Sequence, residues 1–258
     1  MSAVVDFRLS ADQIPENMVD TSATSEFLAA IVGSVDRADL DVMARSMEAK
    51  SQWVSTTLGA ASIAVMDEAQ ILALLRCFFS SRRKARAAID ALGWQQVRDA
   101  IRDLLHSGSS LAERMASFEE SFAEFDQIAA DTGWDLLHLY DPSRYWLWSA
   151  WLWNPRTETG ALRLVTADEV DLAGSSRMES YSRVGQCLAI VNATTRSMGI
   201  VGEGPFCLDV FLACVYGIYM YTVLRMRMSQ EFNRIVPPLP SLARRLLGIH
   251  QWEVETCP

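Results

Sequence analysis

The chain has 258 residues, of which 50% are hydrophobic and 21% are charged. This composition is typical of one large or two small globular domains and excludes a disordered or fibrous chain. A chain of this length can bury enough surface to fold without disulfides or a structural metal. Its formal net charge of −9 disfavours a protein that coats nucleic acid with its whole surface.

Helical spacing dominates the sequence from Thr21 to about Gly133, where apolar residues return every three or four positions and β-branched runs are few. The clearest helix start is the Ser110–Glu113 capping box, in which each side chain satisfies the other residue's backbone amide. We expect Gly133 to end that helix. The pattern predicts helices over residues 25–35, 38–58, 62–79, 83–92, 94–105 and 110–131.

The sequence changes character after Asp141-Pro142 and becomes rich in tryptophan. Residues 145–172 are the segment in which we expect β structure, as a small hairpin closed by the loop from Asn154 to Gly160. A short helix is the alternative, because periodicity does not separate the two in short apolar runs. Helical spacing then returns over residues 176–198, 206–232 and 241–247.

These elements predict a mainly α fold, a multi-helix globular bundle with the small hairpin as its one β feature. We expect a helical part over residues 1–133 and a Trp-rich part over residues 134–258, or else one continuous domain. The stretch Val210–Leu224 has no charged residue, but it is shorter than the roughly 20 residues that a membrane span needs. It therefore predicts a buried core helix, and no membrane span is expected.

The cysteines and the amino-terminal sequence indicate a cytoplasmic protein. The five cysteines are scattered and contain no C-x-x-C pair, which is typical of reduced thiols. The first residues contain Asp6 and no apolar run of signal-peptide length. We expect no cofactor.

The tryptophan cluster is a candidate partner-binding site, because tryptophan favours interface anchors as well as cores. It places half of the chain's eight tryptophans within eight positions: Trp146, Trp148, Trp151 and Trp153. Burial in a dense internal core is the alternative interpretation.

A basic island is the candidate nucleic-acid-binding site. It contains Arg82, Arg83, Lys84 and Arg86, with Arg76 before it and Arg98 and Arg102 after it. The nearby Gly93-Trp94 offers a turn between two short helices, as in a helix-turn-helix unit that contacts phosphates. The net charge of the chain opposes this interpretation, and pairing with acidic side chains is the alternative.

Two Asp-Leu-Leu-His motifs form a candidate metal site. Aspartate and histidine three positions apart share a helical face and could hold a cation together. The residues concerned are Asp103, His106, Asp135 and His138. Di-iron bundle proteins use glutamate at the acidic position, so these motifs depart from that pattern.

One short phrase carries a resemblance. Residues 136–145, LLHLYDPSRY, resemble an L-L-H-x-x-x-P-x-R-[FY] phrase of helical bacterial proteins in DNA modification and defence systems. The match covers ten residues of 258 and implies association with DNA without assigning any catalytic residue.

The sequence contains no decisive catalytic motif, so we expect a non-catalytic cytoplasmic protein of interaction or assembly. It would act in a larger complex or a homo-oligomer, through its tryptophan cluster and the acidic helix over residues 110–131. The first alternative is a DNA-associated helical protein of a bacterial modification or defence system, and the second is a metal-dependent helical enzyme.

Overall fold

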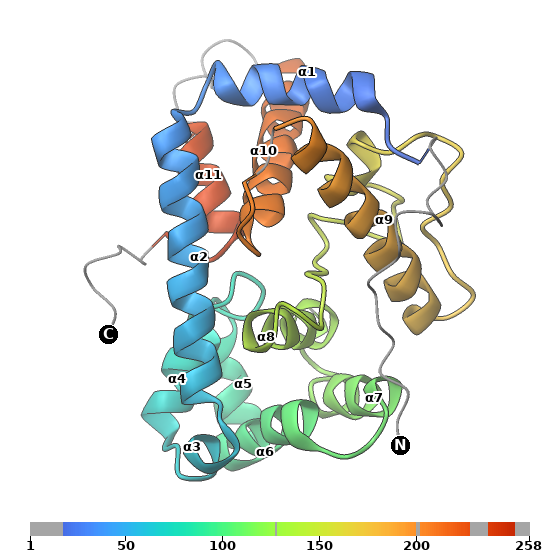
Figure 1. Ribbon diagram of the computed structural model, residues 1–258. Coiled ribbons are helices and arrows are strands. Elements are labelled where there is room, and N and C mark those ends of the chain that lie inside the picture. The colour runs from blue at the N-terminus through green and yellow to red at the C-terminus, as the bar shows by residue number, and fades with distance from the viewer. Residues whose placement is uncertain (1–17, 127, 200–201, 228–236, 251–258) are drawn as a thin grey trace. The chain divides into compact units, whose positions relative to one another are not determined.

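The computed structural model describes residues 18–126, 128–199, 202–227 and 237–250, and within these ranges it is all-helical, with no β-strand (Figure 1). The mainly α prediction is confirmed. The described residues divide into two compact units, one formed by residues 48–149 and the other by residues 18–47 and 150–250. The long helix α2, Arg37–Thr57, begins in the second unit and continues into the first.

Helix α6 is the centre of the first unit. It packs against five other helices of this unit and buries Val97, Ile101 and Leu104 on one face. The helices of this unit that follow α2 are α3 (Ala60–Ala64), α4 (Glu68–Arg76), α5 (Ala85–Leu92), α6 (Trp94–His106), α7 (Leu111–Ser121) and α8 (Gly133–Tyr140).

Two helices of the first unit are shorter than the sequence predicts. The helix expected over residues 62–79 is divided into α3 and α4, because Asp67 and Gln70 form a capping box that starts a new helix. The helix expected over residues 110–131 does begin at its Ser110 capping box, but it ends at Ser121.

Gly133 begins α8, so the prediction that it ends a helix is wrong. A π-helical turn, Ile128–Thr132, leads directly into α8. A Cβ atom at Gly133 would lie 3.0 Å from side-chain atoms of both Met115 and Phe118. Glycine therefore allows α8 to approach α7 closely, and the domain boundary expected after residue 133 falls inside this unit.

In the second unit, α10 is the central helix and packs against α1 and α11. All side chains from Leu208 to Val215 are buried, whereas residues 218–221 are half-buried and Thr222 is exposed. The expected helix is present, and its first half is the part that belongs to the core. A Cβ atom at Gly217 would lie 2.5 Å from Leu239, which shows how closely α10 and α11 approach. The bounds are α1 Thr21–Val32, α9 Arg177–Ser197, α10 Cys207–Arg227 and α11 Leu239–Leu246. None of the described helices is long and apolar enough to cross a membrane.

The expected hairpin around residues 145–172 is reduced to a tight loop with one isolated bridge, Asn154 to Thr159. The amides of Ala161 and Leu162 donate to the carbonyl oxygens of Trp151 and Leu152 at 2.9 and 3.0 Å. The chain therefore folds back where the sequence predicts, but a 3₁₀ turn, Leu162–Leu164, replaces the second strand.

Candidate nucleic-acid interface

Arg82, Arg83 and Lys84 of the basic island lie on the connection between α4 and α5, residues 77–84, here called the basic loop. Arg76 ends α4 just before this loop, and Arg86 lies in the first turn of α5. Two serines anchor the loop from inside the first unit. The Ser80 hydroxyl lies 2.7 Å from the Thr132 hydroxyl and 3.1 Å from the Asp135 carboxylate. Ser81 donates to the carbonyl oxygen of Leu75 at 2.6 Å. The loop therefore has fixed internal contacts, although it contains no helix.

A buried lysine and a half-buried aspartate that interact electrostatically underlie this anchor. Lys50 is only 2% exposed, and its Nζ lies 5.1 Å from the centre of the Phe78 ring. Burial lowers the pKa of Lys50 to about 8, although the charge of Asp135 opposes the shift. Burial and the charge of Asp131 raise the pKa of Asp135 to about 7, against the opposing effects of Lys50, Ser80 and His138. Each group therefore offsets part of the cost of burying the other.

The outer side of the basic loop carries an exposed aromatic ring beside cations. Phe79 is 41% exposed, and the guanidinium carbon of Arg82 lies 4.7 Å from the centre of its ring. Arg76, Arg83 and Lys84 are exposed, and none of these three forms an ion pair with a described acidic residue. Positive charge is therefore uncompensated at both ends of the loop.

Three other basic residues of the island and its flanks, Arg86, Arg98 and Arg102, are neutralised within the chain. Arg86 pairs with Glu68 and Asp90 at 2.9 and 2.7 Å. Along α6, Arg98 and Arg102 alternate with two aspartates, and their ion pairs measure 2.9–3.0 Å. The seven basic residues of the island and its flanks are thus not equivalent: Arg86 has acidic partners, whereas Arg83 and Lys84 have none among the described residues. The cations without acidic partners, Arg76, Arg83 and Lys84, lie within five positions of Phe79 in the sequence.

The tryptophan cluster contributes to the interior of both units. Trp148 in the first unit is 5% exposed and stacks on Trp134, with ring centres 5.6 Å apart. In the second unit, Trp151 and Trp153 are 6% and 3% exposed, and Trp151 lies 6.2 Å from Tyr216. Trp146 is half-buried. Because most of this ring area is used inside the chain, the hypothesis of a partner-binding site at these residues stays a prediction without an exposed surface here to support it.

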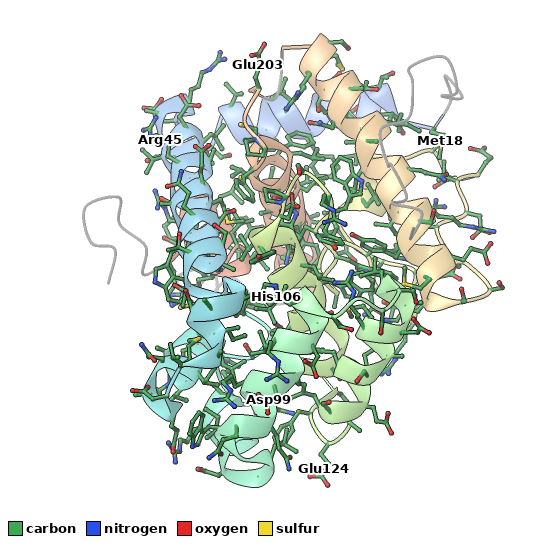
Figure 2. All side chains as sticks on the ribbon, turned by 60° about the horizontal axis from the view of Figure 1, so that its bottom comes forward. Met18, Arg45, Asp99, His106, Glu124 and Glu203 are labelled. Carbon is green, nitrogen blue, oxygen red and sulfur yellow. The ribbon has the colours of Figure 1, made fainter. Side chains whose placement is uncertain are left out.

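The four candidate metal ligands have separate partners. Asp103 is exposed and pairs with Arg102, whereas His106 Nε2 lies 2.7 Å from the Leu58 carbonyl oxygen. Asp135 accepts from Ser80, and His138 Nδ1 lies 2.8 Å from the Tyr145 carbonyl oxygen. Figure 2 labels His106 at the end of α6, with Asp99 earlier on the same helix. In the described ranges, no group of three or more histidine, cysteine, aspartate or glutamate side chains could hold a metal ion.

The phrase over residues 136–145 forms a structural junction. Besides the contact between His138 and the Tyr145 backbone, the Tyr145 hydroxyl accepts from Arg114 at 3.2 Å. Arg114 also donates to the Leu104 carbonyl oxygen at 2.6 Å. These contacts fix the chain after α8, and the resemblance therefore rests on residues that stabilise the fold.

A polar hollow of about 370 Å³ lies between α6 and α7. Its lining includes Asp103, Glu113, Arg114 and three serines. Glu113 is engaged in capping α7 through Ser110, which lowers its pKa. Two carboxylates against one guanidinium give this hollow no net attraction for an anion.

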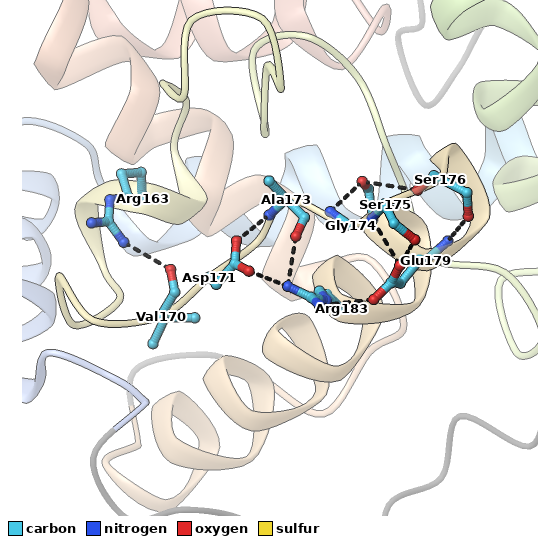
Figure 3. A network of polar contacts seen from close by, with 10 residues as sticks. Arg163, Val170, Asp171, Ala173, Gly174, Ser175, Ser176, Glu179 and Arg183 are labelled. Carbon is cyan, nitrogen blue, oxygen red and sulfur yellow. Dashed lines mark hydrogen bonds and ion pairs between the residues drawn. The ribbon is translucent and has the colours of Figure 1, made fainter.

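The second unit contains a polar network on the segment that leads into α9 (Figure 3). Arg183 donates to Asp171, to the Ala173 carbonyl oxygen and to Glu179. Glu179 also accepts from the Ser175 amide at 2.8 Å. Each charged group of this network has a partner inside it, and Arg183 also bonds the backbone, so the network orders residues 171–183. Two carboxylates share one guanidinium, so the network offers no attraction for an anion.

The sequence locates the basic residues but not the roles of Phe79 and Lys50. Both residues fall in helices that local spacing predicts, over residues 62–79 and 38–58, and that spacing does not distinguish them from their neighbours. The contact of Ser80 with Asp135 joins residues 55 positions apart, so no local pattern predicts it.

Family models, curated proteins and solved structures were all compared with this chain, and none of them matches it.

Proposed function

We propose that this protein binds DNA through the phosphate backbone, with the basic loop as the contact surface. The observation that carries the proposal is the exposure of Arg76, Arg83 and Lys84 without acidic partners, whereas Arg86, Arg98 and Arg102 are each neutralised. Uncompensated cations gain by replacing the counterions of a phosphate chain, whereas neutralised ones must first break an ion pair.

The internal anchors of the loop support the same proposal. The hydroxyls of Ser80 and Ser81 bond groups in the interior of the first unit. The exposed cations are therefore carried by a backbone whose position is fixed by these bonds. Phosphate contacts position a protein on nucleic acid without reading sequence. The proposed binding is therefore independent of sequence and local to one face, which is compatible with the chain's net charge of −9.

The test is a titration of fluorescein-labelled DNA with the purified protein at a series of salt concentrations, followed by fluorescence anisotropy. We expect the logarithm of the binding constant to fall linearly with the logarithm of salt concentration, with a slope of about −2 for three phosphate contacts on a single strand. Arg83→Glu combined with Lys84→Glu should weaken binding at low salt by about tenfold or more and flatten the slope.

A matched control is available at Arg156. This residue is exposed in the loop of the second unit, and its charge reversal there disturbs no ion pair with a described residue. Arg156→Glu combined with Arg45→Glu changes the net charge by the same amount as the loop variant. Equal weakening by the control and the loop variant would reject the basic loop as the binding surface.

A further inference from the structure

The exposed ring of Phe79 is a feature that phosphate binding alone does not explain. Its neighbour Phe78 is 1% exposed and belongs to the core, whereas Phe79 is 41% exposed. The Arg82 guanidinium lies over one face of the Phe79 ring, and the ring stays 41% exposed, next in the sequence to Arg83 and Lys84. Aromatic rings and guanidinium planes among cations are the groups on which unpaired bases stack.

The helix that follows the loop is poorly suited to reading a duplex. Two of the exposed residues of α5 are alanines, Ala87 and Ala91. The other two, Arg86 and Asp90, pair with each other at 2.7 Å. This face therefore offers no free donor or acceptor for base edges in a major groove, where direct reading of sequence takes place.

We propose that the basic loop binds single-stranded DNA, with one unpaired base stacked against Phe79 and Arg82 and the neighbouring phosphates held by Arg83, Lys84 and Arg76. This inference rests on the DNA-binding function proposed above and adds the class of strand that is bound. In a duplex the bases are already stacked on one another, so Phe79 gains nothing there. On a single strand, the ring and the cations act together.

The experiment compares three probes by fluorescence anisotropy: a short oligothymidylate, an abasic strand of the same length and a duplex of the same length. The abasic strand carries the same phosphates without bases, so it isolates the contribution of stacking. The wild-type protein should bind the oligothymidylate about tenfold more tightly than the abasic strand. Phe79→Ala should remove this preference and leave the affinity for the abasic strand unchanged. Phe79→Trp should retain the preference, because it keeps a stacking surface.

The possible results separate the two proposals. Equal affinity of the wild-type protein for all three probes, with loss in the charge-reversed loop variant, would support DNA binding and overturn the single-strand inference. Tighter binding of the duplex would also overturn it. Absence of binding to every probe would overturn both proposals. Because Phe79 is an exposed side chain, its substitution should leave the fold intact, which circular dichroism of each variant checks.

Discussion

Ser80 and Asp135 lie 55 positions apart in the sequence, yet the Ser80 hydroxyl donates to the Asp135 carboxylate at 3.1 Å. Through this bond the exposed basic loop is connected to the half-buried Asp135, which interacts electrostatically with the buried Lys50. Buried polar groups without a hydrogen-bond partner are costly, so this arrangement makes the position of the loop part of the stability of the first unit.

Removal of the Ser80 hydroxyl should therefore affect both folding and DNA binding. Ser80→Ala should lower the free energy of unfolding by about 1 to 3 kcal/mol, because it leaves Asp135 with one bond fewer. It should also weaken DNA binding, since the loop loses an anchor. Urea denaturation and anisotropy measure the two effects. Ser117→Ala, on the exposed face of α7, is the control and should change the free energy of unfolding by less than about 0.5 kcal/mol.

Lys50 and Asp135 should be energetically coupled. Lys50→Met retains most of the side-chain volume but leaves Asp135 without its nearby cation. It should cost about 1 to 3 kcal/mol at neutral pH, because about half of Asp135 is ionised there and the rest is already protonated. The double variant Lys50→Met with Asp135→Asn contains no unpaired charge and should be more stable than Lys50→Met alone. A double-mutant cycle by urea denaturation measures this coupling. Additive losses would contradict the arrangement of the two groups.

The raised pKa of Asp135 predicts a specific dependence of stability on pH. Its ordinary value is 3.8 and its value in the folded protein is about 7. The folded state thus holds the proton more tightly, and the stability that Asp135 contributes is present below pH 3.8 and is lost as the pH rises through about 7. Lys50 is charged in both states over most of this window, because its folded pKa is about 8.

Asp135→Asn tests this dependence, because asparagine does not titrate. The free energy of unfolding of the wild type minus that of the variant should fall on the order of a few kcal/mol between about pH 4 and pH 7. Contributions of groups that do not interact with Asp135 are common to both proteins and cancel in this difference, whereas Lys50, whose pKa the charge of Asp135 raises, adds to the difference mainly near and above pH 7. A difference that stays constant over this range would show that the carboxyl group has an ordinary pKa.

Local signals in the sequence predicted the helices, but the contacts that define the site are long-range. The Ser110 capping box and the helical periodicity of residues 176–198 depend on neighbours a few positions away, and both predictions are confirmed. The error at Gly133 arises because its role is a close contact with Met115 and Phe118, which no local pattern encodes. The basic residues can likewise be found in the sequence. Which of them have acidic partners depends on contacts between side chains, so only the structure distinguishes Arg86, which is paired, from Arg83 and Lys84, which are not.

Gly160 should not tolerate a side chain. It has a φ of 142°, and a Cβ atom there would lie 2.3 Å from the Leu152 carbonyl oxygen. Gly160→Ala would therefore break the loop that returns Ala161 to Trp151, at a cost of about 1 to 3 kcal/mol in the free energy of unfolding. Gly108→Ala is a matched control because a Cβ atom there meets nothing within 4 Å. Thermal unfolding of both variants checks this, and equal melting temperatures would contradict the geometry.

Arg183 should stabilise the second unit in a manner that depends on pH. Hydrogen bonds from Ser175 and then from Arg183 lower the pKa of Glu179 below its ordinary value of 4.5. A carboxyl group with a lowered pKa contributes stability that is present above its unfolded value and is lost as the pH falls through its folded value. Arg183→Gln removes part of that contribution, so its melting temperature should fall furthest below that of the wild type at neutral pH. The gap between the two melting temperatures should narrow as the pH falls below 4.5 and Glu179 becomes protonated. The part of the gap that remains reflects the bond from Arg183 to the Ala173 carbonyl oxygen, which does not depend on pH. Arg156→Gln is the control, because it removes an exposed charge of the same unit that has no acidic partner among the described residues. Its melting temperature should differ from that of the wild type by the same small amount at every pH. The same pH dependence in both variants would contradict the role of the pair formed by Arg183 and Glu179.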